Sequence, residues 1–248
     1  MELSGFFSEN KKVALAFSGG VDSAYLLYAA KTAGADVRAY YVKSVFQPQF
    51  ELEDAKRLAA ELTADMRILE ADVLALQTVA DNPGDRCYHC KKLIFHTIAE
   101  AAREDGYTVL LDGTNASDEE GDRPGMRALM ELSVRSPLRE CGLTKEKIRS
   151  LSKEAGLFTW SKPAYACLAT RIPTGESITK EKLSATEAAE EYLFSLGFTD
   201  FRVRRLGEAA RVQFPAKQLG KVLENREEIV KELKQYYNAV LLDLEARE

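Results

Sequence analysis

The first two thirds of the chain alternates short apolar runs with longer segments in which apolar residues recur every three or four positions. The apolar runs are typical of buried strands; they are 12–17, 37–42, 66–69 and 108–111. The segments between them, such as 49–62, have the spacing of amphipathic helices. This alternation predicts an α/β fold, a parallel twisted sheet with helices on both faces and ligands at the carboxyl ends of the strands.

A different pattern begins after residue 166. Helical and strand patterns follow one another without βαβ alternation, at 179–196, 201–206, 210–214 and 240–244. We therefore predict two domains, 1–166 and 167–248, of which the second is a smaller α+β domain.

A glycine-rich stretch, Ser18-Gly19-Gly20-Val21-Asp22-Ser23, joins the first strand to the following helix. Backbone N–H groups at the start of a helix point toward an anion, and adjacent glycines let the chain approach a phosphate closely. Ser18 and Ser23 supply hydroxyl donors. The lysine of an ordinary P-loop is missing. The stretch predicts a phosphate-binding loop of another kind, and a tight turn without ligand is the alternative.

Composition limits the possible functions. Of the 248 residues, 46% are hydrophobic and the formal net charge is −5, which indicates a globular protein and argues against a large nucleic-acid surface. No apolar run approaches the roughly 20 residues of a membrane span, and residues 1–10 lack the pattern of a secretion signal. We expect a cytoplasmic protein without a membrane partner.

Turn-forming and acidic residues follow the fourth strand, in the stretch Asp112-Gly113-Thr114-Asn115-Ala116-Ser117-Asp118. Because parallel strands end at one edge of the sheet, this stretch is expected near the glycine-rich loop. Asp118 or Asp112 is a candidate ligand for Mg²⁺, which prefers oxygen ligands. A solvated turn is the alternative for each of these residues.

The four cysteines are too few for a disulfide framework and are better interpreted as ligands, nucleophiles or core residues. Cys87 and Cys90 lie at a helix start with a spacing that suits a shared metal or a redox pair. With Cys167 they make three thiolates, the number that leaves one iron of a 4Fe-4S cluster open. Cys167, four residues before Arg171 in a long loop, is also a candidate thiolate nucleophile. Cys141 has no partner nearby in the sequence and is predicted to be a packing residue or a spare thiol.

Two arginines share one face of a strand in the C-terminal part. Alternation places Arg202 and Arg204 on one side and Val203 on the other. Two guanidinium groups so placed can bind one phosphate. A solvated sheet face is the alternative.

Together these motifs resemble the PP-loop ATP pyrophosphatases and, within them, the LarE family of sulfur transferases that build the nickel-pincer nucleotide. The glycine-rich stretch indicates the superfamily alone. The narrower resemblance covers nearly the whole chain and rests on further motifs, which are 112–115, 122–125, 135–139, 167–171 and the strand with Arg202 and Arg204. It implies that 1–166 is the ATP pyrophosphatase domain. Residues 167–248 would then serve sulfur transfer, substrate binding and oligomerisation.

The resemblance implies a reaction in two steps. Mg-ATP adenylates a carboxylate of pyridinium biscarboxylic acid mononucleotide with release of pyrophosphate, and sulfur then replaces AMP to give a thiocarboxylate. The residues that it implies for ATP binding are Ser18, Gly19, Gly20, Asp22, Ser23, Ser44, Gly113 and Asn115. Cys167 and Asp22 are implied to be catalytic, and Asp118 to bind Mg²⁺. The residues implied for substrate binding are Arg171, Arg202 and Arg204. Ser117 stands where the family's acidic pair has its first carboxylate.

The family has two sulfur sources. Sulfur comes either from the cysteine that matches Cys167, which is left as dehydroalanine, or from a 4Fe-4S cluster held by three cysteines. Cys87 and Cys90 favour the cluster, because a sacrificial donor needs one thiol only. A cluster-dependent tRNA thiolase, an ammonia-using synthetase and a nucleotide sensor without turnover are alternatives. The acidic composition argues against the tRNA thiolase. A homo-oligomer is implied by the family.

Overall fold

The computed structural model describes residues 2–118 and 124–247, and its contacts divide the chain into two compact units. The first unit consists of Met1–Val73 and Asp85–Lys162, and the second of Leu74–Gly84 and Pro163–Glu248. The assignment of separate functions to 1–166 and 167–248 stays a prediction. No helix in the described ranges is long and apolar enough to cross a membrane.

A parallel four-stranded sheet lies in the middle of the first unit, which confirms the predicted α/β fold. Its order is β3-β2-β1-β4. The strands are β1 (Lys12–Ala16), β2 (Asp36–Lys43), β3 (Asp65–Glu70) and β4 (Leu110–Leu111). Leu15 of β1 lies opposite Ala39 of β2 and Leu111 of β4. Because β1 has a neighbouring strand on each side, the loop that follows it lies in the middle of the carboxyl edge of the sheet and not beside an edge strand.

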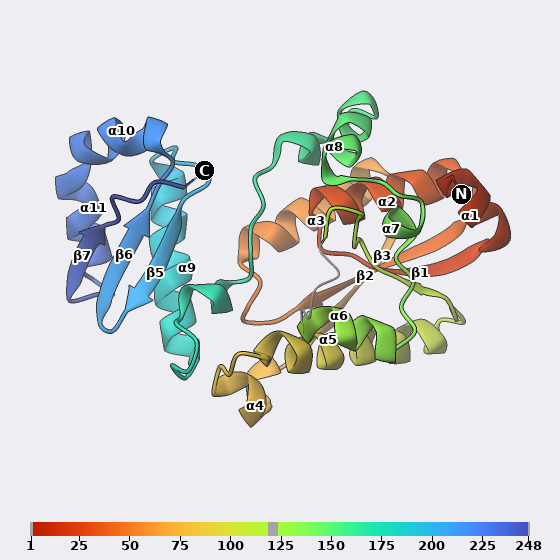
Figure 1. Cartoon of the computed structure of the whole chain (residues 1–248), viewed down its shortest axis with the longest axis horizontal. Helices are drawn as coiled ribbons and strands as arrows, with labels where there is room; N and C mark the ends of the chain where they lie inside the picture. Colours follow the sequence, from red (N-terminus) through yellow and green to blue (C-terminus); the bar gives the residue numbers. More distant parts are fainter. Residues whose placement is uncertain (1, 119–123, 248) are drawn as a thin grey trace. The chain divides into compact units, whose positions relative to one another are not determined.

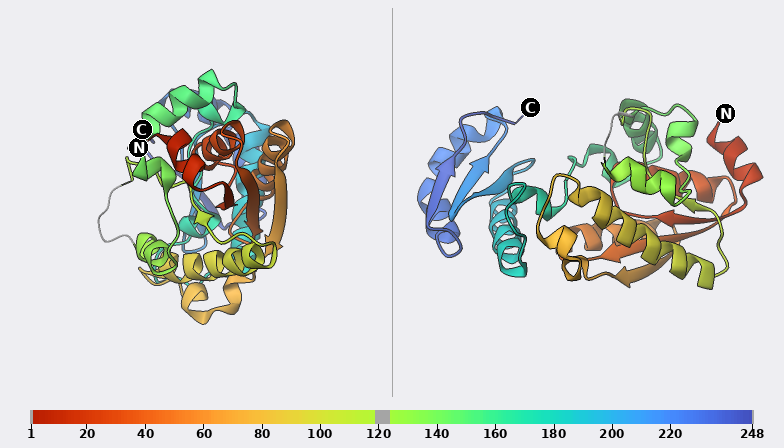
Figure 2. Two further views of the ribbon diagram at one scale, coloured as in Figure 1. Left: turned by 90° about the vertical axis from the view of Figure 1, so that its right-hand side faces the viewer. Right: turned by 60° about the horizontal axis from the view of Figure 1, so that its bottom comes forward.

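Helices cover both faces of this sheet (Figure 1). Helices α2 (Val21–Thr32) and α3 (Gln49–Glu61) lie on one face, and α5 (Arg86–Glu104) lies on the other. Figure 2 shows α6 (Pro124–Glu131) beside α5. Separate apolar cores form on the two faces, around Leu27 and around Ile98 respectively. The remaining elements of this unit are α1 (Leu3–Glu9), α7 (Pro137–Glu140), α8 (Lys145–Glu154) and the 3₁₀ turn η2 (Phe158–Ser161).

The fourth strand is shorter than its apolar pattern predicts. The chain leaves α5 through Gly106, whose φ is +80°, and its backbone hydrogen bonds to β1 begin at the Val109 carbonyl, which accepts from Ala14 N at 2.8 Å. Only Leu110 and Leu111 then pair with β1. Pairing depends on where the chain meets its neighbour, and the local pattern does not contain that information.

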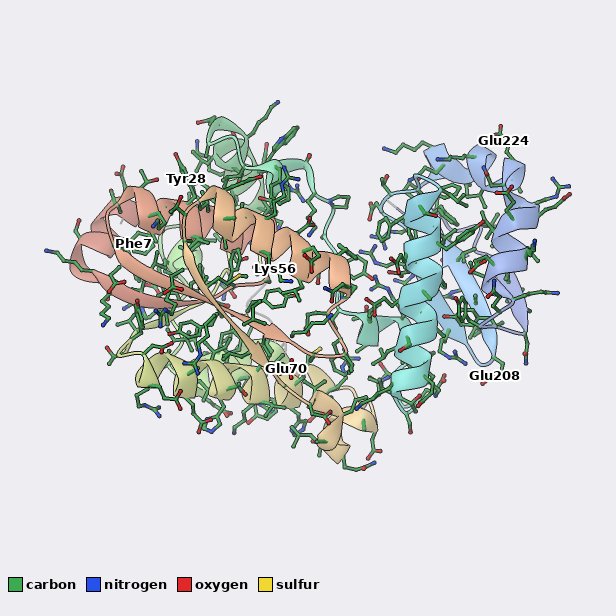
Figure 3. All side chains as sticks on the ribbon, turned by 180° about the vertical axis from the view of Figure 1, so that it is seen from behind. Phe7, Tyr28, Lys56, Glu70, Glu208 and Glu224 are labelled. Atoms are coloured by element: carbon green, nitrogen blue, oxygen red, sulfur yellow. The ribbon has the colours of Figure 1, made fainter. Side chains whose placement is uncertain are left out.

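The second unit contains a mixed sheet of order β5-β6-β7. Strands β5 and β6 are antiparallel, and β6 and β7 are parallel. Phe198, Phe201 and Phe214 form the centre of its core, with ring centroids 5.0 to 5.6 Å apart. Glu208 at the β5–β6 turn and Glu224 at the end of α10 lie at opposite ends of this unit (Figure 3). Its main elements are α9 (Lys180–Ser195), β5 (Arg202–Leu206), β6 (Ala209–Gln213), α10 (Leu219–Glu224), α11 (Arg226–Leu233) and β7 (Ala239–Leu242).

The short segment Leu74–Gly84, which includes α4 (Gln77–Ala80), packs in the second unit although it precedes most of the first in sequence. Its anchor is Asn82, whose amide nitrogen donates to the carbonyls of Pro173 at 2.8 Å and Glu176 at 3.2 Å. Gly175 N donates in return to the Asn82 carbonyl at 2.8 Å. These bonds fix the loop that follows the 3₁₀ turn η3 (Leu168–Arg171).

A charged cluster at the end of α5 ties this helix to the sheet. Asp105 accepts hydrogen bonds from Tyr40 Oη at 2.8 Å and from Arg67 at 3.1 Å, and it pairs with Arg38 at 2.9 Å. The Tyr40 hydroxyl, followed by the two guanidinium groups, lowers the pKa of Asp105 to about 2. The carboxylate therefore stabilises the fold at neutral pH.

We expect Asp105→Asn to make the melting temperature depend less on pH between about pH 5 and pH 2. A carboxylate with a lowered pKa contributes stability above its unfolded pKa of about 4, and that contribution disappears as the pH falls toward 2. The difference in melting temperature between native protein and variant should be largest above pH 5 and vanish near pH 2. Glu104→Gln is the control, because Glu104 pairs with Arg67 from an exposed position. An equal effect of both changes would contradict the assignment.

Candidate active site

The glycine-rich stretch forms a closed loop after β1. Ser18 N donates to Ser23 Oγ at 3.3 Å, and the two serine hydroxyls are 3.1 Å apart. Ser23 Oγ also donates to the Gly20 carbonyl at 3.2 Å. Gly20 is the N-cap residue of α2 and brings no side chain over the helix start. The serines thus hold the shape of the loop, and the first N–H groups of α2 are the donors that an anion can meet. Direct contacts of the serines with phosphate stay a prediction.

Two features of the loop require glycine at position 19. Its φ is +71°, a region that L side chains rarely adopt. A Cβ added at this position would lie 3.1 Å from Ala55 Cβ of α3. The loop therefore sits directly against α3, and only glycine leaves room for that contact.

We expect Gly19→Ala to destabilise the protein more than Gly34→Ala. Both positions have a positive φ, so each change carries left-handed strain of about 1–2 kcal/mol. Gly34 has φ +75° and open space around its Cβ position, whereas Gly19 meets α3. Urea unfolding of the two variants isolates the steric part. Equal losses of unfolding free energy would show that the loop does not press on α3.

Asp22, on the first turn of α2, pairs with Lys145 at the start of α8. Their Oδ2 and Nζ atoms are 2.5 Å apart. Burial raises the pKa of Asp22 above its usual value, although the hydrogen bond and the charge of Lys145 oppose that rise. The other oxygen, Oδ1, is buried and has no hydrogen-bond partner among the described residues. A cation and a carboxylate with spare acceptor capacity therefore lie at the mouth of the loop.

The stretch after β4 packs directly on the glycine-rich loop. A Cβ at Gly113 would lie 3.0 Å from Ser23 N. Asp112 is buried and accepts from Ser136 Oγ at 2.6 Å and from Thr114 Oγ1, so it shapes this turn. Buried Asn115 accepts from Ser117 N at 2.8 Å. The structure thus brings the predicted Gly113 beside the helix start that carries Asp22.

Asp118 and Ser117 end this stretch in different roles. Asp118 Oδ2 accepts from Asn115 N at 2.9 Å, and its charge acts on Asp22. Ser117 Oγ accepts from Lys145 N at 2.9 Å, so the residue that departs from the family pattern anchors α8. The Mg²⁺ role of Asp118 stays a prediction, and Asp112, the other candidate ligand, accepts two hydrogen bonds within the turn.

Ser44 follows β2 at the same edge of the sheet. It is buried, and its hydroxyl donates to Gln47 Oε1 at 2.7 Å and accepts from Phe46 N at 3.2 Å. These bonds shape the β2–α3 connection. The predicted contact of Ser44 with adenosine is untested.

Cys87 and Cys90 lie at the start of α5, as the sequence predicts. Cys87 is exposed and Cys90 half-buried, and neither forms a disulfide. The guanidinium of Arg86 donates to Cys87 Sγ at 3.4 Å. Cys167 belongs to the second unit, so the structure does not test the three-cysteine arrangement. No group of three or more His, Cys, Asp or Glu side chains gathers as a metal site within residues 2–118 and 124–247.

Cys141 behaves as the packing residue that was predicted. It lies against the main core of the first unit. Burial raises the pKa of its thiol.

Cys167 is the N-cap residue of η3 in the second unit. Its carbonyl accepts hydrogen bonds from Thr170 N at 3.0 Å and Thr170 Oγ1 at 2.8 Å. Arg171 is 1% exposed, and it donates to the Ala166 carbonyl at 3.0 Å. The backbone on both sides of the cysteine is thereby held.

Strand β5 packs against η3 and brings the two predicted arginines to the cysteine loop. Arg202 is 5% exposed and donates to the Phe201 and Ala164 carbonyls, each at 2.6 Å. The solvated sheet face that was the alternative is therefore wrong for Arg202, because the 163–166 segment covers it. Arg204 donates to the neutral Gln213 side chain at 2.5 Å.

Arg202 and Arg204 lie among further arginines. Burial, followed by the charges of Arg171 and Arg247, lowers the pKa of Arg202 to about 10. Burial and neighbouring arginines also lower the pKa of Arg204. Arg171, Arg211 and Arg247 act on this pair, and Glu190, Asp200 and Asp243 oppose them. Guanidinium groups gathered in this way suit a phosphate group.

Sequence reasoning missed Lys145 and Glu190. Lys145 lies 123 residues from its partner Asp22, and nothing local marks it. The sequence does contain a sign of Glu190, because this charged residue has the helical spacing of the buried positions Leu183, Thr186 and Leu193 of α9. Asp122 and Arg123 of the family motifs lie outside the described residues.

The first strand of the parallel sheet leads through a glycine-rich loop into a helix, and the polar turn after the adjacent strand β4 packs on that loop. This arrangement defines a PP-loop nucleotide-binding domain. The asparagine synthase family model matches residues 7–121. A pyridinium-3,5-bisthiocarboxylic acid mononucleotide synthase of Lactiplantibacillus plantarum is 34% identical over 94% of this chain and 86% of its own length. The chain belongs to the LarE family, the family of that synthase.

Two further relatives match this chain over most of its length and over most of their own length. An uncharacterized protein of Synechocystis is 36% identical over 90% of this chain and 84% of its own length. One of Methanocaldococcus jannaschii is 30% identical over 96% of this chain and 91% of its own length.

Proposed function

We propose that this protein uses ATP to replace carboxylate oxygen by sulfur in pyridinium-3,5-biscarboxylic acid mononucleotide. A carboxylate oxygen of the substrate attacks the α-phosphorus of ATP, and pyrophosphate leaves. A sulfur nucleophile then attacks the carbonyl carbon of the acyl adenylate, and AMP leaves. The name of the L. plantarum relative and the chemistry of the two units support this sequence.

The first unit serves adenylation. The helix start after Gly20 binds the pyrophosphate portion of ATP, and Lys145 neutralises charge that develops on the leaving group. Asp118, whose charge acts on Asp22, would hold the Mg²⁺ that accompanies ATP, because Mg²⁺ prefers oxygen ligands. Ser44, Gly113 and Asn115 complete the nucleotide site.

The second unit serves sulfur transfer, and one observation carries the proposal. A thiol, Cys167, lies in a loop that packs against a strand whose arginines, Arg202 and Arg204, are flanked by further arginines. Such a group of guanidinium side chains suits the phosphate of a mononucleotide. Arg171 contributes to that group from within the cysteine loop.

The donor set also suits a 4Fe-4S cluster. Cys87, Cys90 and Cys167 form no disulfide, and each is at least partly exposed, so their sulfur atoms are accessible to a ligand. When bound through these residues, a cluster with one open iron supplies exchangeable sulfide. Without a cluster, Cys167 itself forms the thioester. Loss of its α-proton and cleavage of its Cβ–S bond then leave dehydroalanine and the thiocarboxylate.

We expect about four iron and four sulfide ions per chain after anaerobic preparation. Cys87→Ala and Cys90→Ala should lose them, and Cys141→Ala, the matched control, should retain them. Multiple turnover should disappear with the iron. Absence of iron after reconstitution would contradict the cluster and leave Cys167 as a donor that acts once per molecule.

The activity itself is tested with purified protein, Mg-ATP and the mononucleotide. AMP and pyrophosphate should form only with the substrate present, and mass spectrometry should show oxygen replaced by sulfur. Nucleotide binding without turnover would overturn the proposal in favour of a sensor.

We also propose a homo-oligomer. The second unit exposes Leu206, Leu241 and Leu244 at 52%, 44% and 85%. Such side chains are suited to contact another copy of the chain.

A further inference from the structure

Glu190 of α9 is a carboxylate buried in the second unit. It is 1% exposed. Burying a charge is costly unless the charge is paired and its oxygens are fully hydrogen-bonded. An apolar residue at this helix position would fill the core without the free-energy cost of burying a charge. The contacts of Glu190 therefore indicate its role.

Its two oxygens accept four hydrogen bonds. Oε1 accepts from Arg171 Nε at 2.8 Å and from Val203 N at 2.9 Å. Oε2 accepts from Arg171 Nη2 at 3.1 Å and from Tyr165 Oη. The donors come from both sides of Cys167 and from the strand residue between Arg202 and Arg204.

Arg171 extends this connection to the cysteine backbone. Its Nη1 donates to the Ala166 carbonyl at 3.0 Å and to Thr170 Oγ1 at 2.8 Å. Thr170 in turn donates to the Cys167 carbonyl. The Tyr165 ring lies 4.6 Å from the Arg171 guanidinium and 5.4 Å from that of Arg202. The loop and the strand are therefore joined through one carboxylate.

The charge of Glu190 also acts on Arg171. Burial by itself lowers the pKa of Arg171, but the hydrogen bonds and charge of Glu190, with smaller contributions from Tyr165 and Cys167, hold it above its usual value. Without Glu190, the cysteine would face an arginine that lacks its counterion. The elements packed against this loop carry further charged groups, which are Lys180, Glu181, Lys182, Glu187 and Glu191 on α9 and Arg202, Arg204 and Arg205 on β5.

We propose that Glu190 is a positioning residue that holds the Cys167 loop and the Arg202–Arg204 strand at one fixed register. The thiol and the phosphate-binding guanidinium groups then meet the same substrate molecule. The inference rests on the proposed function for its meaning in sulfur transfer. The geometry of Glu190 itself does not depend on that function.

Glu190→Gln is the main test, with Glu191→Gln on the exposed side of the same helix as its matched control. Two readouts are measured on folded protein, checked by its melting curve. The first is the sulfur incorporated per pyrophosphate released, which should fall about tenfold or more because a displacement of about 1 Å misaligns thiol and substrate. Pyrophosphate release should stay within about twofold.

The second readout needs no substrate. Hydrogen exchange of the 164–171 and 202–204 backbone, followed by mass spectrometry, should become about tenfold faster in Glu190→Gln, because Val203 N and Arg171 lose their charged acceptor. Exchange in α10 and α11 should stay unchanged, whereas a general loss of stability would raise exchange throughout the unit. Unchanged exchange and an unchanged sulfur ratio in folded Glu190→Gln would overturn the proposal, as would equal effects in Glu191→Gln.

If Glu190→Gln does not fold, the variant Tyr165→Phe tests the positioning role of Glu190 instead. It removes one donor to Glu190 and keeps the aromatic ring between the arginines. A lowered sulfur ratio supports the inference and an unchanged ratio overturns it. If the native protein makes no thiocarboxylate, the proposed function fails, whereas hydrogen exchange of the 164–171 and 202–204 backbone still tests Glu190.

Discussion

Cys167→Ala should abolish thiocarboxylate formation, by at least about a thousandfold, while adenylation continues. Both sulfur sources require this thiol, either as a cluster ligand or as the attacking group, and alanine retains neither property. Pyrophosphate release should stay within about threefold of the native value, because the glycine-rich loop and Lys145 belong to the other unit. Single-turnover assays with Mg-ATP and the mononucleotide measure both quantities.

Cys141→Ala is the control for this experiment, since that thiol packs against the core and burial raises its pKa. It should leave sulfur transfer unchanged. Sulfur incorporation at the native rate by Cys167→Ala would remove this residue from the mechanism. Dehydroalanine at position 167 after turnover would identify the sacrificial route.

Lys145→Ala should slow pyrophosphate release by about a hundredfold. The side chain is the cation that the structure places at Asp22, on the helix start after the glycine-rich loop. Its removal leaves the charge of the leaving pyrophosphate less compensated. It also removes the group that opposes the raised pKa of Asp22, so the acid limb of the pH–rate profile should move to higher pH.

Lys147→Ala provides the comparison, because Lys147 lies on the same helix turn and is exposed. It should change the rate less than twofold. Adenylation by Lys145→Ala at the native rate would show that the pair with Asp22 is structural. Restoration by Lys145→Arg would show that charge at this place, and not the amine, is what matters.

Part of the candidate site follows from local sequence. The apolar run before Ser18, the adjacent glycines and the helical pattern after Ser23 predict a phosphate loop, and the loop and helix are observed where expected. Alternation likewise predicts that Arg202 and Arg204 share a face. It does not predict that the 163–166 segment covers Arg202, because that contact joins residues 38 positions apart.

The sequence by itself determined the order of strands and helices, the parallel sheet and the residue types at the loop after β1. These follow from periodicity and turn chemistry, which act between near neighbours. Only the tertiary structure decided that Lys145 meets Asp22, that Leu74–Gly84 packs in the second unit, and that Glu190 joins Tyr165, Arg171 and Val203. Such contacts depend on how whole elements pack, and local pattern does not encode which distant side chain fills the space beside a buried charge.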